Sequence, residues 1–249
     1  MKYNRLKFNP KLHAYLLDDK PITGVTTILK VIAKPFLIPW AANMAVDYIE
    51  KHQVIGHYNM ATKTGSIEFD MGFTELLKQA KSAHTQKRDK AGDIGKEAHK
   101  LCENWIKSKD GNVKKSKSPQ VNKMVRNFCE WANKNKVKFI ASEKKVFSEK
   151  YWFCGTYDFL CEIDKKIWLG DIKTGSGIYP DMFFQTAGYQ ICEEEMNPKL
   201  KIDGHIIVNI KKNGTLLEKR SISNKDNKEA FLSALTLYRI MSKVEGNTL

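Results

Sequence analysis

Two aspartates and a lysine in one stretch of the chain have the types and spacing for metal-dependent phosphoryl chemistry. Asp158 lies in the apolar run GTYDFL, and Asp171 comes two residues before Lys173 in the tripeptide Asp-Ile-Lys. Residues two apart on a strand point to one face, so Asp171 and Lys173 should project together while Ile172 enters the opposite, apolar layer. If the two strands form a hairpin, the two carboxylates can lie close enough to repel each other, and a hard divalent cation relieves that repulsion.

Phosphodiester hydrolysis needs the kind of cation that such carboxylates would hold. A metal bound by oxygens that keeps several waters polarises the phosphate, lowers the pKa of its water and steadies the leaving oxygen. Lys173 could hold or deprotonate the attacking water and offset the charge of the transition state. Glu143, on the preceding strand-like run, could reach the same place. The alternative is that Asp158 and Asp171 are acids at a strand edge or turn and that Lys173 is solvated.

Two predicted helices offer further polar side chains. Gln185 and Tyr189 stand four residues apart in a helix expected from about Pro180 to Met196, so they share a face. His99 lies in the helical stretch DIGKEAHKLCENWIKS, where Glu103, four residues on, could orient it. Alternatively, His99 has a structural role and Glu103 is an acid on the helix surface. Gln185 and Tyr189 could equally lie in the interior, with a neighbour forming the hydrogen bond of the tyrosine hydroxyl.

The elements around these residues predict the fold class. An amphipathic helix, QVNKMVRNFCEWANKN, precedes three strand-like runs, VKFIASEKKVF, WFCGTYDFLCEI and KIWLGDIK, of which the last two meet at a turn over residues 164–166. After the helix with Gln185 come the runs HIIVNIKK and TLLEKRSI, joined at Asn213-Gly214, which is a hairpin signal. A last helix is expected from about Lys225 to Lys243. The order α-β-β-β-α-β-β-α predicts an α/β fold with a central mixed β-sheet flanked by helices.

The N-terminal half is expected to form strands and a helical arm. The run KFNPKLHAYLLDDKP predicts two short strands around Asp18-Asp19. Thr23 or Thr26 could cap a short helix, VTTILKVI, and Pro39 could open a second helix, WAANMAVDYIEKH. Residues 73–88 are expected to be helical and basic, and the loop KSKDGNVKKSKSP is the expected hinge. We therefore expect residues 1–110 to carry the strands, the arm and His99, and residues 111–249 to form the core of one catalytic unit.

Composition narrows the class of protein. The 249 residues are 42% hydrophobic and 10% aromatic, enough for a sizeable core, which excludes a disordered chain, a disulfide miniprotein and a membrane channel. The chain has 42 Lys and Arg against 28 Asp and Glu, a net charge of +14. Such an excess suits a nucleic-acid partner, but a lysine-rich surface that keeps the protein in solution explains it equally well.

The cysteines and the N-terminus predict a cytoplasmic protein. The five cysteines are odd in number and none has CxxC spacing, which argues against a zinc ribbon and a secreted disulfide framework. Most lie in apolar runs, as buried thiols would in a reducing compartment. The N-terminal residues have no signal-peptide pattern, and the apolar stretch VIAKPFLIPWAANMAV is too interrupted by Lys34, Pro35 and Pro39 to span a membrane.

Taken together, the motifs resemble a known family. G-T-Y-D, D-I-K-T and Q-T-A-G-Y resemble motifs of the PD-(D/E)XK nuclease superfamily, specifically its RecB-type branch with a Q-x-x-x-Y helix. The upstream G-K-E-A-H-K-L-C-E resembles the G-x-x-x-H motif of the same branch. The resemblance covers about residues 92–210 and implies a restriction-endonuclease-like core, with a central mixed sheet flanked by helices.

The resemblance also implies roles for single residues. Asp158 and Asp171 would be ligands of Mg²⁺ or Mn²⁺, with the Ile172 carbonyl as a third ligand and Lys173 as the catalytic lysine. His99 would be a further metal ligand or near-ligand.

Other roles follow from the same resemblance. Gln185 and Tyr189 would position the nucleic-acid strand, and Thr174 would also contact DNA. The resemblance supports Glu143 as a metal ligand less strongly than the two aspartates. Some nucleases of this branch carry an iron–sulfur cluster on one upstream cysteine and three near the C-terminus. No cysteine follows Cys192, so no such cluster is expected.

A second resemblance lies near the N-terminus. The stretch HAYLLDDKPITGVTTILKVIAKPFLIPWAA is similar to the opening of phage-type RecB-like exonucleases and mitochondrial genome maintenance exonucleases, although Gly24 stands where serine is usual. It implies a helical arm, roughly residues 25–110, over the active site, enclosing single-stranded nucleic acid. Thr26, Thr27 and Trp40 could contact that strand, or Trp40 could pack under the arm.

The basic tract KQAKSAHTQKRDK in that arm includes the pair Lys87 and Arg88. It would contact phosphates, or it is a solvated helix face.

The resulting hypothesis is a Mg²⁺- or Mn²⁺-dependent deoxyribonuclease that degrades single-stranded or end-containing double-stranded DNA from its ends, in recombination, repair or replication. Partner proteins from those processes could join it. Two alternatives stay open: a structure- or sequence-specific endonuclease of the same fold, and an inactive nucleic-acid-binding module. The positive charge would draw in the phosphate backbone, so salt should weaken substrate binding steeply.

Overall fold

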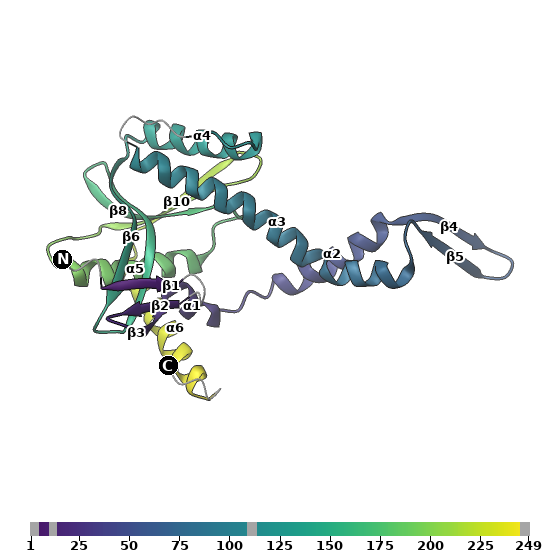
Figure 1. Ribbon diagram of the computed structural model, residues 1–249, viewed down its shortest axis with the longest axis horizontal. Helices are drawn as coiled ribbons and strands as arrows, with labels where there is room; N and C mark the ends of the chain where they lie inside the picture. The colour runs from purple at the N-terminus through teal and green to yellow at the C-terminus, as the bar shows by residue number, and fades with distance from the viewer. Residues whose placement is uncertain (1–4, 10–13, 109–113, 245–249) are drawn as a thin grey trace. The chain divides into compact units, whose positions relative to one another are not determined.

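The computed structural model describes residues 5–9, 14–108 and 114–244 (Figure 1). The chain forms two compact units. The sheet unit comprises Met1–Ile32 and Gly95–Leu249, and the inserted unit comprises Ala33–Ile94. The boundary expected near residue 110 thus lies within the sheet unit, because the helical stretch that carries His99 belongs with the sheet.

The sheet unit is built on one mixed β-sheet of eight strands. The strands are β1 (Leu6–Asn9), β2 (Ala14–Leu17), β3 (Lys20–Gly24), β6 (Lys138–Ser148), β7 (Phe153–Ile163), β8 (Lys166–Lys173), β9 (Gly204–Ile210) and β10 (Leu216–Ser221). Their order is β1-β2-β3-β7-β8-β9-β10, with β6 also paired to β7. The pairs β3–β7 and β8–β9 are parallel and the others are antiparallel, which confirms the predicted mixed sheet.

Helices flank this sheet as predicted. They are α1 (Val25–Ile28), the 3₁₀ turn η2 (Leu29–Val31), α4 (Pro119–Lys134), α5 (Pro180–Met196) and α6 (Asn224–Val244). The helix α5 has the predicted bounds, and β6, β7 and β8 lie within one residue of the predicted runs. The predicted cap of α1 is wrong: the residue before the helix is Gly24, and no side chain caps it.

Two apolar layers hold the helices on opposite faces of the sheet. Phe159 and Leu160 are neighbours on β7, so their side chains point to opposite faces. Phe159 packs in an aromatic cluster with Trp131 of α4. Leu160 belongs to the core that includes Tyr189 of α5 and Phe231 of α6. The helix α4 therefore covers one face and α5 with α6 the other, as the ribbon also shows (Figure 1).

The inserted unit contains a hairpin that sequence analysis did not predict. Its elements are α2 (Leu37–Lys51), β4 (Gln53–Asn59), β5 (Thr64–Phe69) and the first part of α3 (Phe73–Lys107). The expectation of an all-helical arm over residues 25–110 is corrected by the antiparallel pair β4–β5. The helix α2 begins two residues before Pro39, in a first turn where no helical hydrogen bond needs the missing N–H.

The helix α3 joins the two units. It runs for 35 residues without a break, so the two helical stretches expected around residues 73–88 and His99 are one element. In the described part of the chain, no helix combines the length and apolar character of a membrane span. The central residues 109–113 of the predicted hinge loop lie outside the described residues.

Candidate metal centre

The candidate site lies where β7 changes its partner. On one side β7 pairs with β3 at Cys154 and with β8 from Phe159 onward. Asp158 lies in the interval between these two ladders. The backbone N–H of Ile172 in β8 donates to Asp158 Oδ2 at 2.6 Å, so a side-chain oxygen ends the ladder. The two strands therefore part at the point where Asp158 and Asp171 lie.

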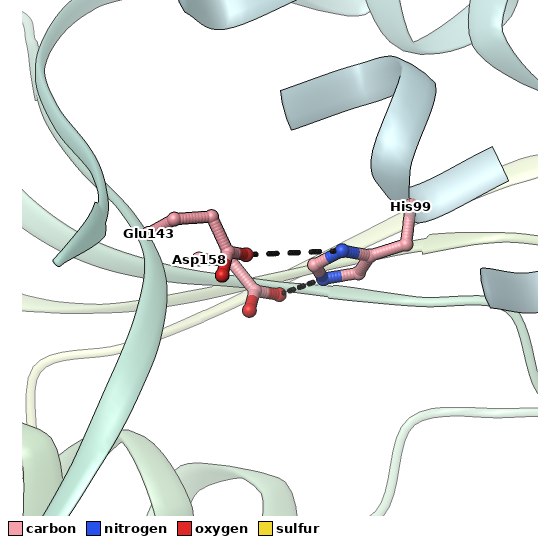
Figure 2. A group of neighbouring side chains, drawn as sticks. All are labelled: His99, Glu143 and Asp158. Carbon is pink, nitrogen blue, oxygen red and sulfur yellow. Dashed lines mark ion pairs between the residues drawn. The ribbon is translucent and has the colours of Figure 1, made fainter. Parts of the chain in front are cut away.

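Three ligand-type side chains converge here from separate elements. His99 projects from α3 toward the carboxylates of Glu143 on β6 and Asp158 on β7 (Figure 2). His99 Nε2 lies 2.8 Å from Asp158 Oδ2, and His99 Nδ1 lies 3.9 Å from Glu143 Oε1. One ligand atom from each residue lies within 4.8 Å of the other two. The structure thus brings together three of the predicted metal ligands.

The side chains of His99, Glu143 and Asp158 are partly buried, and burial and their mutual charges shift the pKa values of His99 and Glu143. Burial opposes the protonation of His99, but Asp158 and Glu143 outweigh it and raise its pKa to about 9. Burial and the charge of Asp158 raise the pKa of Glu143 to about 7. Protonated His99 therefore supplies the positive charge that these acids require.

Glu143 has an unusual backbone conformation. Its φ is 50°, in the left-handed region that non-glycine residues rarely adopt. This conformation costs an L-residue about 1–2 kcal/mol. It occurs opposite Asp158, between the paired positions Ser142–Phe159 and Lys144–Tyr157. Strain of this kind at a converging set of ligand-type groups is typical of functional sites.

A second group of polar side chains links β8 to α5. Lys173 Nζ lies 2.8 Å from Asp171 Oδ2 and donates to Asp171 Oδ1 at 3.0 Å and to Gln185 Oε1 at 3.1 Å. Gln185 Nε2 donates to Asp171 Oδ1 and to the Tyr189 hydroxyl, both at 3.1 Å. The side chains of Asp171 and Lys173 project together, as their spacing predicts.

Asp171 is buried, whereas 25% of the Lys173 side chain beside it is exposed. Burial raises the pKa of Asp171, while Lys173 opposes that shift. Burial acts to lower the pKa of Lys173, but Asp171 and Asp158 outweigh it and raise the pKa overall. Lys173 is therefore a stable cation. Asp171 Oδ2 accepts no hydrogen bond of good geometry from the described residues and could accept another positive partner.

Tyr189 occupies the interior position that the sequence left open. Only 3% of its surface is exposed, and it packs in the core under the sheet. Its ring lies so close to Gly155 that a Cβ there would be 2.4 Å from Tyr189 Cε1. Tyr189 thus positions Gln185, and direct contact of Tyr189 with a strand stays a prediction. Sequence analysis did not assign a role to Gly155, although this glycine is the first residue of the motif G-T-Y-D.

A second glycine sets the position of His99. A Cβ on Gly95 of α3 would lie 2.5 Å from Thr174 Oγ1, just past the end of β8. Gly95 is one helical turn before His99, so the close approach of α3 to the end of β8 brings His99 to the sheet. Thr174 therefore contacts α3, and its predicted contact with DNA is untested.

Glu103 has different partners from the one expected. Its carboxylate accepts from Lys100 Nζ at 2.8 Å and from Lys107 Nζ at 2.5 Å. Although burial favours the protonated form, the two lysines hold the pKa of Glu103 below its usual value. Glu103 is one turn beyond His99 on α3, and the lysines rather than the imidazole engage its oxygens. The expected orienting contact is thus replaced by two ion pairs.

The other residues expected to contact DNA have local partners. The Trp40 ring meets the His84 ring edge-on, with centroids 6.3 Å apart, in agreement with the packing alternative. Lys87 Nζ donates to Met44 Sδ at 3.2 Å, and Arg88 Nε to Asp89 at 3.0 Å. These three residues lie in the inserted unit and exposed Thr26 lies in the sheet unit, and DNA contacts by all four remain predictions.

The excess positive charge is concentrated in the sheet unit. The inserted unit has eight Lys or Arg against seven Asp or Glu, so it is nearly neutral. Almost all of the net charge of +14 therefore belongs to the unit that carries the candidate metal centre. The inserted unit as a whole therefore adds little to the positive charge that is expected to attract a phosphate backbone.

Comparisons with known proteins give little guidance. No protein-family model matches the chain, and no curated protein matches it. Among solved structures, it is similar to the alkaline exonuclease LHK-Exo from Laribacter hongkongensis, with 10% identity and a TM-score of 0.30 over 60% of this chain and 92% of that one. A likeness this weak carries no argument about function, so the interpretation of the site rests on its geometry.

Proposed function

We propose that this protein is a Mg²⁺- or Mn²⁺-dependent deoxyribonuclease that hydrolyses DNA from its ends. The supporting observation is the convergence of His99, Glu143 and Asp158 within 4.8 Å, beside the buried Asp171 and its partly exposed partner Lys173. The ordered motifs and the charge of the sheet unit agree with a phosphodiester substrate.

The residues present fit a hard divalent cation. Carboxylate oxygens are the ligands that Mg²⁺ prefers, and Mn²⁺ also accepts an imidazole nitrogen. Asp158 and Glu143 offer carboxylates and His99 offers a ring nitrogen, while Asp171 Oδ2 still has an unused lone pair. The carbonyl of Ile172 stays a predicted ligand. When bound, the cation would polarise the scissile phosphate and lower the pKa of a water molecule.

The chain itself supplies charge and orientation. Lys173 is held as a cation by Asp171, so its role is to stabilise negative charge at the phosphate rather than to remove a proton. Gln185 forms hydrogen bonds with the side chains of Lys173 and Asp171, and it donates a further hydrogen bond to the Tyr189 hydroxyl. The same network keeps Lys173 from swinging into solvent, which preserves its position before substrate arrives.

The test combines substrates, metals and matched variants. End-labelled single-stranded and double-stranded DNA and a covalently closed circle are incubated with Mg²⁺, Mn²⁺ or a chelator. Asp171→Asn and Lys173→Ala should each lower the rate at least about 10²-fold, as loss of a preorganised charge does. Asp164→Asn is the control, since Asp164 is an exposed acid at the opposite end of the same hairpin.

Each outcome has a distinct reading. Metal-dependent loss of label from linear DNA, with the circle intact, supports hydrolysis from ends, whereas opening of the circle identifies an endonuclease. DNA binding without cleavage under every condition would identify a binding module. If Asp171→Asn cut as fast as Asp164→Asn, the assigned site would be wrong.

A further inference from the structure

A separate groove lies on the sheet unit between α3 and α4. Its volume is about 790 Å³, within the range of about 300–1,000 Å³ typical of ligand sites. The floor is apolar and includes Leu101 and Trp105 of α3 and Val125 of α4. The ring of Trp105 is fixed by edge-on contacts with Phe128 and Phe139, each at a centroid distance of 6.0 Å. The groove thus has a preformed aromatic surface.

The rim of this groove is strongly basic. Lys114, Lys115, Lys123 and Arg126 line it, and none of its described lining residues is acidic. Arg126 Nε lies 4.0 Å from the carboxylate of Glu130, and both side chains are exposed. A pair so exposed contributes little and leaves the guanidinium accessible. Four cations around an apolar floor are complementary to a polyanion with flat apolar groups.

The backbone that follows Lys114 and Lys115 is held in place by hydrogen bonds of Ser116. Ser116 Oγ donates to Glu97 Oε1 of α3 at 2.6 Å. The backbone N–H of Ser116 donates to Asn122 Oδ1 at 2.8 Å, and Asn122 Nδ2 donates to the Ser116 carbonyl at 2.9 Å. These bonds tie the segment that carries Lys114 and Lys115 to both helices. The segment that carries the two lysines is therefore anchored next to the groove that they line.

The groove lies close to the candidate metal centre. Leu101 follows His99 by two residues, so their side chains leave α3 in directions about 200° apart. The two sites therefore flank one helix, separated by about the 10–12 Å width of a helix with its side chains. A strand cut at the metal centre needs only a few nucleotides to reach the groove.

We infer that this groove binds single-stranded DNA that continues from the metal centre, an inference that rests on the proposed nuclease function. A base would lie on the apolar floor beside Trp105, and the lysines and Arg126 would contact the phosphates. A duplex would present only its backbone, because its paired bases cannot reach an apolar floor. The ligand is therefore an unpaired strand.

The first test measures the salt dependence of binding. In the inactive Asp171→Asn background, the double substitution Lys114→Ala with Lys115→Ala should lower the slope of log Kd against log salt by about 1.4 for an oligodeoxythymidylate strand, because each phosphate contact contributes about 0.7. The matched control is Lys199→Ala with Lys201→Ala, which removes two exposed lysines outside the groove. Its slope should equal that of the parent.

The second test reports position directly. Cys129 lines the groove and is half-buried, whereas the other four cysteines are buried, so alkylation at alkaline pH should select Cys129. Oligodeoxythymidylate at ten times its Kd should slow this alkylation about tenfold, since the free fraction falls as 1/(1 + [L]/Kd). Duplex DNA of equal length should protect much less.

The outcomes separate this inference from the proposed function. Bis(p-nitrophenyl) phosphate is too short to extend from the metal centre into the groove, so its hydrolysis does not need the groove, and variants at Lys114 and Lys115 in the otherwise active enzyme should hydrolyse it as the parent does. If the parent cuts DNA but the groove variants keep the parental salt slope and DNA leaves Cys129 reactive, the groove inference fails alone. If DNA protects Cys129 but nothing is cleaved in any metal, the proposed function fails and the groove remains a binding site.

Discussion

The substitution Gly155→Ala tests how the apolar layer supports the pair Asp171 and Lys173. The added Cβ would lie 2.4 Å from Tyr189 Cε1 and 3.0 Å from Tyr189 Cδ1, whereas carbon atoms pack at about 3.5–4.0 Å. The Tyr189 ring must therefore move by about 1 Å, and overpacking of this kind costs about 1–3 kcal/mol. That shift would stretch the 3.1 Å bond from Gln185 to the Tyr189 hydroxyl beyond hydrogen-bond range.

Gln185 also contacts Lys173 and Asp171, so activity should fall together with stability. A displacement of about 1 Å at a positioning residue lowers the rate by up to about 10²-fold. Urea unfolding without metal measures the free energy, and cleavage of end-labelled DNA measures the rate. In Gly175→Ala, where the new Cβ meets nothing within 4 Å, both quantities should stay close to the parental values.

A double-mutant cycle decides whether Tyr189 is the cause. In a Tyr189→Leu background the ring is absent, so Gly155→Ala should lose most of its cost, with a coupling energy of about 1–2 kcal/mol. Strictly additive free energies would refute the reasoning, as would a Gly155→Ala protein that unfolds and cuts like the parent.

Four further outcomes are expected. Mn²⁺ should raise the Tm of the parent but not that of Asp158→Asn, and equal Tm shifts would show that Asp158 is not a ligand of the metal. Ser118→Ala should lower the free energy of unfolding by about 1 kcal/mol, because Ser118 Oγ accepts from the N–H of Val121 at the start of α4; an unchanged urea midpoint would contradict this. Gly92→Ala should raise it by about 1 kcal/mol, since Gly92 lies inside α3 and its Cβ would meet nothing, and a lower Tm would indicate an unseen contact. Burial, assisted by Lys228, lowers the pKa of His205 to about 4. Below pH 6.5 the unfolded chain therefore binds a proton that the folded protein does not, and the free energy of unfolding should fall by about 3 kcal/mol as the pH drops from 6.5 to 4. In His205→Gln this part of the pH dependence should disappear.

The sheet region was predictable because its signals are local. Alternating and continuous apolar runs marked β6, β7 and β8, and the turn at Asp164 and the Asn213-Gly214 pair marked the hairpins. The pairing of Asp171 with Lys173 also followed from strand geometry alone. Each of these features depends on residues a few positions apart, which is the range over which sequence patterns act.

The remaining features depend on contacts between distant segments. The hairpin β4–β5 turns through residues 60–63 without an Asn-Gly or Asp-Gly pair, and no strict alternation marks its strands. The contacts of Gly95 with Thr174 and of Gly155 with Tyr189 appear only when helices pack on the sheet. By contrast, the ion pairs of Glu103 with Lys100 and Lys107 join residues three and four apart on one helix, so they could have been predicted from the sequence.

At Glu143, the left-handed backbone favours residues that would be poorer metal ligands than glutamate. Glycine at this position would avoid the conformational cost, and asparagine would reduce it, but neither has a carboxylate for a cation. A selection for heat resistance alone should therefore favour Glu143→Gly or Glu143→Asn, and the surviving proteins would be more robust and poorer at holding metal. Because Glu143 belongs to the candidate metal centre, directed evolution of this protein for use at high temperature should include a screen for metal binding in every round.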